Sequence, residues 1–202
     1  MSGLLDPAAL RTRLQELMKE HEVPGAAVGV FAEGRTIEVA AGVVNLRTGV
    51  EATPDTVFEL GSIGKSWTAT ALMQLVDEGL ADLDVPIRTY LPDFRVADPD
   101  VSATVTLRHL LSHTSGIDGD HFEDTGRGDD CLERYVASCA SLGQTHPMGD
   151  TMSYCNTGYS IIGRIIEVLT DKVWDDAMRE RLFEPLGLTR TGTLPEHAIL
   201  HR

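Results

Sequence analysis

The sequence predicts an α+β protein in which a helix and a short antiparallel sheet come first and a mainly helical region follows. Residues 10–17 carry leucines at helical spacing, and residues 26–45 are rich in valine, isoleucine and alanine, as strands are. Beyond residue 61 the apolar positions recur mostly with a helical period. We therefore expect one domain in two parts, 1–61 with the helix and strands and 62–202 with most of the helices.

The N-terminal helix and hairpin are bounded by recognisable signals. Asp6 before Pro7 is typical of an N-cap and a first helical residue, and Pro24 marks the end of this helix. The apolar stretches 26–34 and 36–45 meet at a short turn that contains glycine, so we expect them to form a β-hairpin.

The chain then leads through irregular structure into a second helix. Residues 45–55 are expected to form a loop, and "TVFEL" (56–60) is expected to form a short strand. The segment 62–78 has an apolar face at helical spacing, and Gly79 is typical of the residue that follows a helix.

Three more helices are expected further along. Thr106 can cap a short helix over 107–113, and the segments 131–142 and 157–171 have helical patterns. The residues 113–130 are rich in glycine and aspartate and predict a long loop, a feature that is usually functional or mobile in a compact domain. Its acid-rich part, 118–130, is compatible both with a border of a substrate cleft and with an ordinary solvated loop.

Composition narrows the range of partners. The 202 residues are 42% hydrophobic and 24% charged, an ordinary globular balance that allows a sizeable core. The formal net charge is −14, and no stretch rich in lysine or arginine offsets it. This acidity argues against nucleic acid and against an anionic membrane as partners.

The cysteines and histidines predict neither a disulfide framework nor a metal site. Cys131, Cys139 and Cys155 are an odd number without metal-ligand spacing, and the histidines show no coordinating pattern, so we expect no metal and no cofactor. Free thiols are typical of a reducing compartment. Residues 1–25 lack a basic stretch followed by a continuous apolar run, so we expect no signal peptide and a cytoplasmic location.

The stretch "ELGSIGKSWTA" (59–69) contains a candidate nucleophile. Ser62 and Lys65 are three residues apart, which places them on one face of a helix, one turn from each other. Serine is a weak nucleophile until a base removes its proton, and lysine is such a base when its surroundings lower its pKa. The N–H groups at a helix start also suit a developing oxyanion. Taken alone, the motif is better explained by a serine N-cap beside an exposed lysine.

A second candidate site lies in "DTMSYCNTGYSIIG" (150–163), just before a helix. In an extended segment, residues two apart face the same way, so Tyr154 and Asn156 share a side while Cys155 turns toward the core. A phenol near an ammonium ionises more easily and can serve as a base or proton relay, and an asparagine amide can hold a substrate carbonyl. The alternative for Tyr154 is a half-buried aromatic residue without a catalytic role.

His113, in "TLRHLLSHTSGI" (106–117), has two interpretations. It can be a general base near the serine. A histidine at the end of a helix, in a Ser-His-Thr-Ser-Gly turn, is better explained as a hydrogen-bonding strut for that turn.

Three motifs in this order resemble the serine β-lactamase-like superfamily: Ser62-Ile-Gly-Lys65, the stretch 110–116 ("LLSHTSG") and Tyr154-Cys-Asn156. The branch of class C β-lactamases, family VIII esterases, D,D-carboxypeptidases and D-aminopeptidases is the most similar, and the resemblance covers nearly all of the chain. It implies a β-lactamase/transpeptidase-like fold, in which an antiparallel sheet packs with helices beside a helical subdomain.

The resemblance also implies a serine hydrolase that works through an acyl-enzyme. In that family pattern Ser62 is acylated and Lys65 accepts its proton. Tyr154 relays the proton, Asn156 contacts the substrate and His113 is structural. The bond cleaved is an ester, a D-amino-acid amide or a β-lactam, and the motifs do not select among these small-molecule substrates. The alternative is a catalytically silent binding or scaffold protein, which need not keep all four reactive residues.

The sequence departs from this family in one respect. Members carry a third motif, usually Lys-Thr-Gly or His-x-Gly, on a C-terminal strand that supplies the second oxyanion-hole N–H. Nothing after Asn156 matches that motif in the right setting. We therefore expect residues 1–202 to be the N-terminal portion of a larger hydrolase, without the C-terminal strands. Its partner would be the C-terminal remainder of the same protein, and residues 1–202 alone would be inactive.

Overall fold

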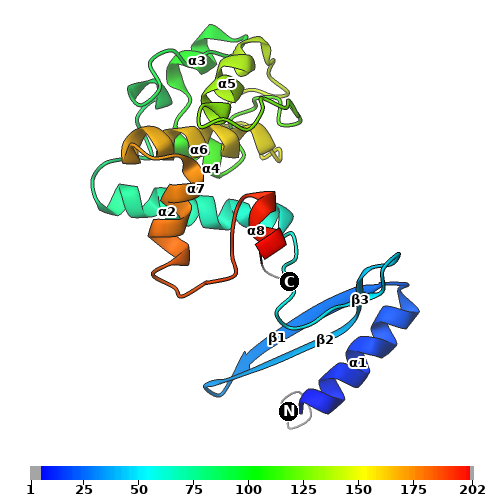
Figure 1. Cartoon of the computed structure of the whole chain (residues 1–202). Helices are drawn as coiled ribbons and strands as arrows, with labels where there is room; N and C mark the ends of the chain where they lie inside the picture. The colour runs from blue at the N-terminus through cyan, green and yellow to red at the C-terminus, as the bar shows by residue number, and fades with distance from the viewer. Residues whose placement is uncertain (1–5, 201–202) are drawn as a thin grey trace. The chain divides into compact units, whose positions relative to one another are not determined.

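The computed structural model describes residues 6–200, which form two compact units (Figure 1). One unit contains residues 6–59 together with 193–200, and the other contains residues 60–192. The first unit holds a sheet and a long helix, and the second holds most of the helices. The α+β class predicted from the sequence is confirmed.

The sheet of the first unit has three antiparallel strands in the order β1-β2-β3. Strands β1 (Gly25–Ala32) and β2 (Arg35–Asn45) form the expected hairpin, in which Val28 lies opposite Val39. The third strand, β3 (Val50–Glu51), pairs with the end of β2.

Helix α1 (Pro7–Glu20) packs against β2 within the same unit. It begins at the predicted cap, because the Asp6 carboxylate accepts a hydrogen bond of 3.0 Å from the Ala8 N–H. Its leucines are half-buried, and Val39 of β2 is 2% exposed. The apolar face of α1 therefore covers apolar side chains on one face of the sheet. The other helix of this unit is α8 (Pro195–Leu200).

The prediction of a strand over 56–60 is wrong, and the third strand lies instead within the stretch 45–55 that was expected to be loop. A turn separates β3 from residues 56–60. The Thr56 N–H donates to the Thr53 carbonyl over 3.0 Å, and the Thr53 N–H donates to Thr56 Oγ1 over 2.9 Å. This turn ends the pairing with β2 before residue 56, so the β-favouring residues that follow adopt irregular backbone.

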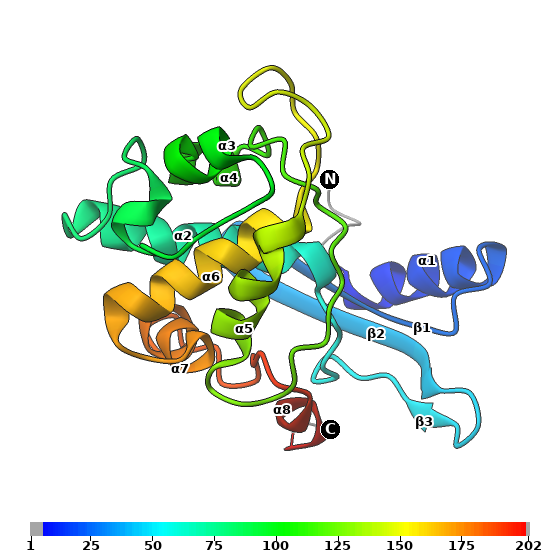
Figure 2. The ribbon, with the colours of Figure 1, turned by 90° about the horizontal axis from the view of Figure 1, so that it is seen from above.

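The second unit is an assembly of helices joined by long irregular segments (Figure 2). In chain order its elements are η2 (Gly61–Ile63), α2 (Gly64–Asp77), η3 (Ile87–Thr89), α3 (Pro99–Thr104), α4 (Leu107–Leu111), α5 (Cys131–Ser138), η4 (Cys139–Ser141), α6 (Asn156–Thr170), α7 (Trp174–Met178) and the π-helix η5 (Arg179–Phe183). The predicted helices at the positions of α2, α4, α5 and α6 are confirmed.

Helix α6 is the centre of this unit and lies between α2 and α5 (Figures 1 and 2). Its Ile161, Ile162, Ile165 and Ile166 are fully buried. Each side chain of this kind contributes about 1.5–3 kcal/mol when it leaves water. These residues fix the axis of α6, and its first turn is therefore held in place by the core behind it.

Helix α2 packs on α6 and ends as predicted. Leu72 and Leu75 are fully buried on the packed face. At the C-terminal end, Gly79 has a φ of +73°, its N–H donates to the Val76 carbonyl, and the Leu80 N–H donates to the Leu75 carbonyl. This Schellman motif requires a left-handed residue, and glycine adopts that conformation without strain.

Candidate active site

Ser62 and Lys65 stand at the start of α2, one turn apart. Ser62 lies in the 3-10 turn η2 that leads into the helix, and Lys65 is the second residue of α2. Lys65 Nζ donates a hydrogen bond of 3.1 Å to Ser62 Oγ. Ser62 is exposed and Lys65 is half-buried, so the hydroxyl is accessible to a substrate while the amine is held beside it.

The first turn of α6 brings the second predicted motif to the same place. Lys65 Nζ donates a hydrogen bond of 2.8 Å to Asn156 Oδ1, and it lies 4.8 Å from the centre of the Tyr154 ring. Asn156 is the first residue of α6, and the N-cap Cys155 between the two is 2% exposed. The extended segment thus turns Cys155 inward and presents Tyr154 and Asn156 to Lys65.

The Tyr154 phenol is electrostatically coupled to both residues of the first motif. Hydrogen bonding with Lys65 and then with Ser62 holds the pKa of Tyr154 below its ordinary value. Tyr154 is 48% exposed. A phenol that ionises more readily, in contact with a serine hydroxyl and open to solvent, can take part in proton transfer at that hydroxyl.

His113 holds the segment around Tyr154 through hydrogen bonds and a ring contact, and it lies close enough to Lys65 to feel its charge. Its Nδ1 accepts a hydrogen bond of 3.0 Å from the Cys155 N–H, and its ring stacks on Tyr154 at 4.6 Å between centres and 29° between planes. Burial, and then the charge of Lys65, lowers the pKa of His113. Since Nδ1 already accepts a main-chain N–H, these contacts favour the predicted strut over a general base.

Main-chain hydrogen bonds hold the segment 113–119 against residues 143–157. The Ser153 N–H donates to the His113 carbonyl over 2.9 Å, and the Asn156 N–H donates to the Gly119 carbonyl over 3.1 Å. A Cβ on Gly119 would lie 2.6 Å from the Cys155 Cα, closer than real side chains approach. The absence of a side chain at Gly119 therefore allows this close packing beneath Tyr154.

Two residues near the site were not singled out from the sequence. Gly119 lies in the long loop, where no periodic pattern marks it. Tyr159, in the second turn of α6, has its ring centre 5.7 Å from Lys65 Nζ and donates from its hydroxyl to the Leu111 carbonyl over 3.2 Å. It falls within the helical pattern of 157–171, and that pattern predicted only that it lies on a helix.

The described residues 6–200 contain no cluster of three or more histidine, cysteine, aspartate or glutamate side chains that could hold a metal ion. Within this same range no helix is long and apolar enough to cross a membrane. A cavity of about 760 Å³ lies beside the last turn of α2, where Gln74, Glu78 and Arg181 are among the lining residues. Ser62 and Lys65 stand at the other end of that helix, so this cavity is separate from the candidate site.

The chain belongs to the β-lactamase family. The family model described as Beta-lactamase matches residues 10–201, which is nearly the whole chain. The β-lactamase/transpeptidase-like fold expected from the three motifs is thereby confirmed, and the solved structures that resemble this chain agree with it.

Similar proteins carry names from several branches of this family. The chain is 54% identical to penicillin-binding protein 4 of Amycolatopsis lactamdurans over 98% of its own length and 52% of that protein. It is 28% identical to the octameric penicillin-binding protein homologue from Pyrococcus abyssi, with a TM-score of 0.82 over 98% of this chain and 47% of that one. It is also 28% identical to the D-amino acid amidase from Ochrobactrum anthropi SV3, with a TM-score of 0.79 over 96% and 55%. The chain thus spans about half the length of these relatives.

Proposed function

We propose that this protein is a serine hydrolase that forms an acyl-enzyme on Ser62. The observation that carries the proposal is the position of Lys65 Nζ, which lies 3.1 Å from Ser62 Oγ and 2.8 Å from Asn156 Oδ1. An amine held between a hydroxyl and an amide, next to a phenol with a lowered pKa, is suited to proton transfer at Ser62.

The proposed reaction has two halves. In the first, Ser62 Oγ bonds to the substrate carbonyl carbon, the carbonyl electron pair moves to oxygen, and the serine proton passes to Lys65. The intermediate collapses as the bond to the leaving amine or alcohol breaks, and Tyr154 delivers the proton to that group. In the second half, water activated by the same two residues attacks the acyl ester, releases the acid and restores the serine hydroxyl.

The substrate class follows from the site and from the relatives together. Asn156 retains an amide N–H₂ group while its Oδ1 accepts from Lys65, so it can donate to a carbonyl in the acyl part of a substrate. One relative is named as a penicillin-binding protein and another as a D-amino acid amidase. We therefore propose small amides, esters or lactams as substrates, with D-amino-acid amides and β-lactams as the first to try.

A covalent labelling experiment tests this proposal. A fluorescent penicillin and a fluorophosphonate are each incubated with the wild type, with Ser62→Ala and with Ser66→Ala, and the modified peptide is located by mass spectrometry. Ser66 is a matched control, because it is an exposed serine four residues later, on the helix α2 that follows Ser62. We expect label on Ser62 in the wild type and in Ser66→Ala, and none in Ser62→Ala. Absence of label with both reagents from a wild-type chain of the relatives' length would favour a silent binding or scaffold protein.

We also propose that turnover requires the part of the protein that corresponds to the rest of these longer relatives. The relatives are about twice as long as this chain, and we expect their additional residues to supply a second oxyanion donor. Loss of one such donor typically slows a reaction by about 10²–10³. The test compares ester turnover by residues 1–202 with turnover by a chain of the relatives' length. Equal rates would contradict the proposal.

A further inference from the structure

We propose that His113 is a positioning residue whose neutral ring holds Tyr154 and Asn156 against Lys65, and that protonation of this ring releases them. The inference rests on the proposed function, because it concerns the same serine, lysine and tyrosine. It adds a regulatory property, a loss of activity on acidification that originates outside the reacting groups.

The first argument is the number of contacts that His113 makes on the segment before α6. Its carbonyl accepts from the Ser153 N–H over 2.9 Å, and its Nδ1 accepts from the Cys155 N–H over 3.0 Å. These two bonds hold the residues on either side of Tyr154, and the imidazole stacks on the Tyr154 ring itself. One residue therefore fixes the main chain and the ring plane of the proposed proton relay.

The second argument is the protonation state that this geometry requires. An Nδ1 atom that accepts an N–H carries no proton, so the neutral ring has its proton on Nε2. A protonated ring has N–H groups at both positions, and the Nδ1–H would then point at the Cys155 N–H. Two donors cannot share a hydrogen bond, so protonation must separate His113 from Cys155 or displace the segment that carries Tyr154.

The surroundings of His113 oppose protonation and set the direction of the pH effect. The groups that face the ring are Lys65 from α2, Tyr154 from the segment before α6, and Tyr159 from α6, whose ring centre is 5.3 Å away. Burial and the Lys65 charge lower the pKa of His113 below 6.5. The neutral ring is therefore kept at neutral pH, and the positioning contact is lost only as the pH falls below 6.5 through this lowered pKa.

The backbone conformation of His113 tolerates a substitution that keeps the hydrogen-bond acceptor and removes the ionisation of the ring. His113 has a φ of +59°, in the left-handed region that asparagine also tolerates. The Oδ1 atom of an asparagine occupies nearly the place of Nδ1 and accepts a hydrogen bond at every pH. His113→Asn thus keeps the acceptor without the ionisation, whereas His113→Phe keeps an aromatic ring without an acceptor.

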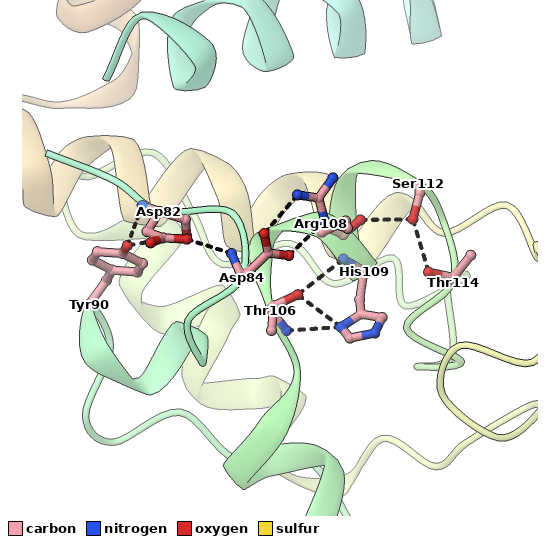
Figure 3. Close-up of polar contacts among 8 residues, drawn as sticks. All are labelled: Asp82, Asp84, Tyr90, Thr106, Arg108, His109, Ser112 and Thr114. Carbon is pink, nitrogen blue, oxygen red and sulfur yellow. Dashed lines mark hydrogen bonds and ion pairs between the residues drawn. The ribbon is translucent and has the colours of Figure 1, made fainter. Parts of the chain in front are cut away.

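His109 provides a matched control on the short helix α4, which ends just before His113 (Figure 3). Its Nδ1 also accepts a main-chain N–H, that of Thr106 at 3.3 Å, and burial also lowers its pKa. The hydrogen bonds of its ring are made with Thr106 at the start of α4 and not with Tyr154 or Cys155. His109→Asn therefore makes the same chemical change four residues away from the proposed positioning contact.

The first test is the pH dependence of Ser62 acylation, measured with a fluorescent penicillin or a p-nitrophenyl ester. We expect the wild-type rate to fall with one additional ionisation below pH 6.5, and we expect this ionisation to be absent in His113→Asn and present in His109→Asn. At pH 8, His113→Phe should be slower than His113→Asn by roughly 10- to 100-fold, the size of effect that a small misplacement of a catalytic group produces. The same acid limb in His113→Asn and the wild type would overturn the proposal.

The second test does not depend on activity, so it separates this inference from the proposed function. Nitrogen-15 NMR of the wild type follows the His113 ring and the Cys155 amide through a pH titration. We expect an Nε2-protonated ring at pH 8 and a shift of the Cys155 amide with the same midpoint as the ring. A Cys155 amide that does not respond, or a ring protonated on Nδ1, would overturn the inference even if Ser62 is acylated. A wild type that shows the coupled titration but no labelling would support the inference and sink the proposed function.

Discussion

At the N-terminal end of α2, Lys65 contacts a hydroxyl, an amide and two aromatic rings, whereas beside its C-terminal end Arg181 holds the carboxylate of Glu78. The Arg181–Glu78 pair has two hydrogen bonds, of 2.8 Å and 3.0 Å. Both ends thus place a cation next to groups that titrate. The two ends differ in the groups whose pKa the cation lowers, which are a carboxylate beside Arg181 and a phenol and an imidazole beside Lys65.

A comparison of these groups shows that a lowered pKa affects function only in some of them. Hydrogen bonding from Arg181 lowers the pKa of Glu78, a carboxylate that is already ionised at neutral pH, so its state at pH 7 does not change. Lys65 lowers the pKa of the Tyr154 phenol and contributes to that of His113. The Tyr154 phenol is protonated and the His113 ring is neutral near the pH at which an enzyme works. A shift in either pKa therefore changes the ability of that group to exchange a proton.

The largest effect is expected when Lys65 loses the ability to exchange a proton. Lys65→Arg keeps the positive charge, but arginine does not deprotonate in proteins, so acylation of Ser62 should slow by about 10⁴, nearly as much as in Lys65→Ala. Stopped-flow acylation by a penicillin measures the rate. Lys172→Arg, beside the other end of α2 where Lys172 pairs with Glu180, should have no effect. Recovery of activity in Lys65→Arg would show that only the charge is needed.

A smaller loss is expected when the phenol is removed. Tyr154→Phe keeps the stacking on His113 but removes the proposed proton relay, and it should slow turnover by roughly 10²–10³. Steady-state hydrolysis of a p-nitrophenyl ester gives the value. Tyr90→Phe is the matched control, because the Tyr90 hydroxyl bonds only to the main chain of Asp82 among the contacts drawn for it (Figure 3). If Tyr154→Phe retains the wild-type rate, the relay must run through another group.

A moderate loss is expected when the close packing beneath Tyr154 is disturbed. In Gly119→Ala the new Cβ would stand 2.6 Å from the Cys155 Cα and 2.8 Å from the Tyr154 carbonyl oxygen, so this backbone must shift. We expect turnover to fall by roughly 10- to 100-fold. Gly143→Ala, where a Cβ meets nothing within 4 Å, should behave as the wild type. Equal rates for the two variants would show that the backbone before α6 can move without consequence.

The smallest effect is expected at the C-terminal end of α2, and it should appear in stability alone. The folded-state pKa of Glu78 is below 4.5, so its pairing with Arg181 stabilises the fold above pH 4.5 and is lost as the pH falls through the lowered value. Glu78→Gln should slightly lower the melting temperature at pH 7, and the difference from the wild type should vanish well below pH 4.5. Acylation of Ser62 should not change. A pH-independent difference in melting temperature would exclude this linkage.

The sequence predicted the parts of the site that depend on local geometry. The i, i+3 relation of Ser62 and Lys65 and the alternation at Tyr154, Cys155 and Asn156 follow from helix and strand periods alone. The contact between Lys65 and Asn156 spans 91 residues, and no local pattern encodes it. Only the resemblance to a family indicated that the two motifs meet.

Features that depend on tertiary contacts or on very short elements were missed or misplaced. Asp98-Pro99 has the same cap signal as Asp6-Pro7, and Asp98 accepts hydrogen bonds from two main-chain N–H groups. Helix α3 nevertheless has only six residues, too few to show a period. The strand β3 has two residues and was assigned to a loop. The strand expected over 56–60 had the right residue types, but a turn before it leaves it without a partner strand.

The attachment of residues 143–157 to the segment 113–119 has a consequence for how such a protein can diversify. The bonds that fix Thr145, Gly149 and Ser153 run from their own N–H groups to carbonyls of that segment, so they do not depend on side-chain identity. Exposed residues between these anchors, such as the 63% exposed Met152, can change in sequence without loss of these main-chain bonds. Natural variation and laboratory libraries can therefore alter this exposed segment while the proposed proton-transfer residues stay unchanged.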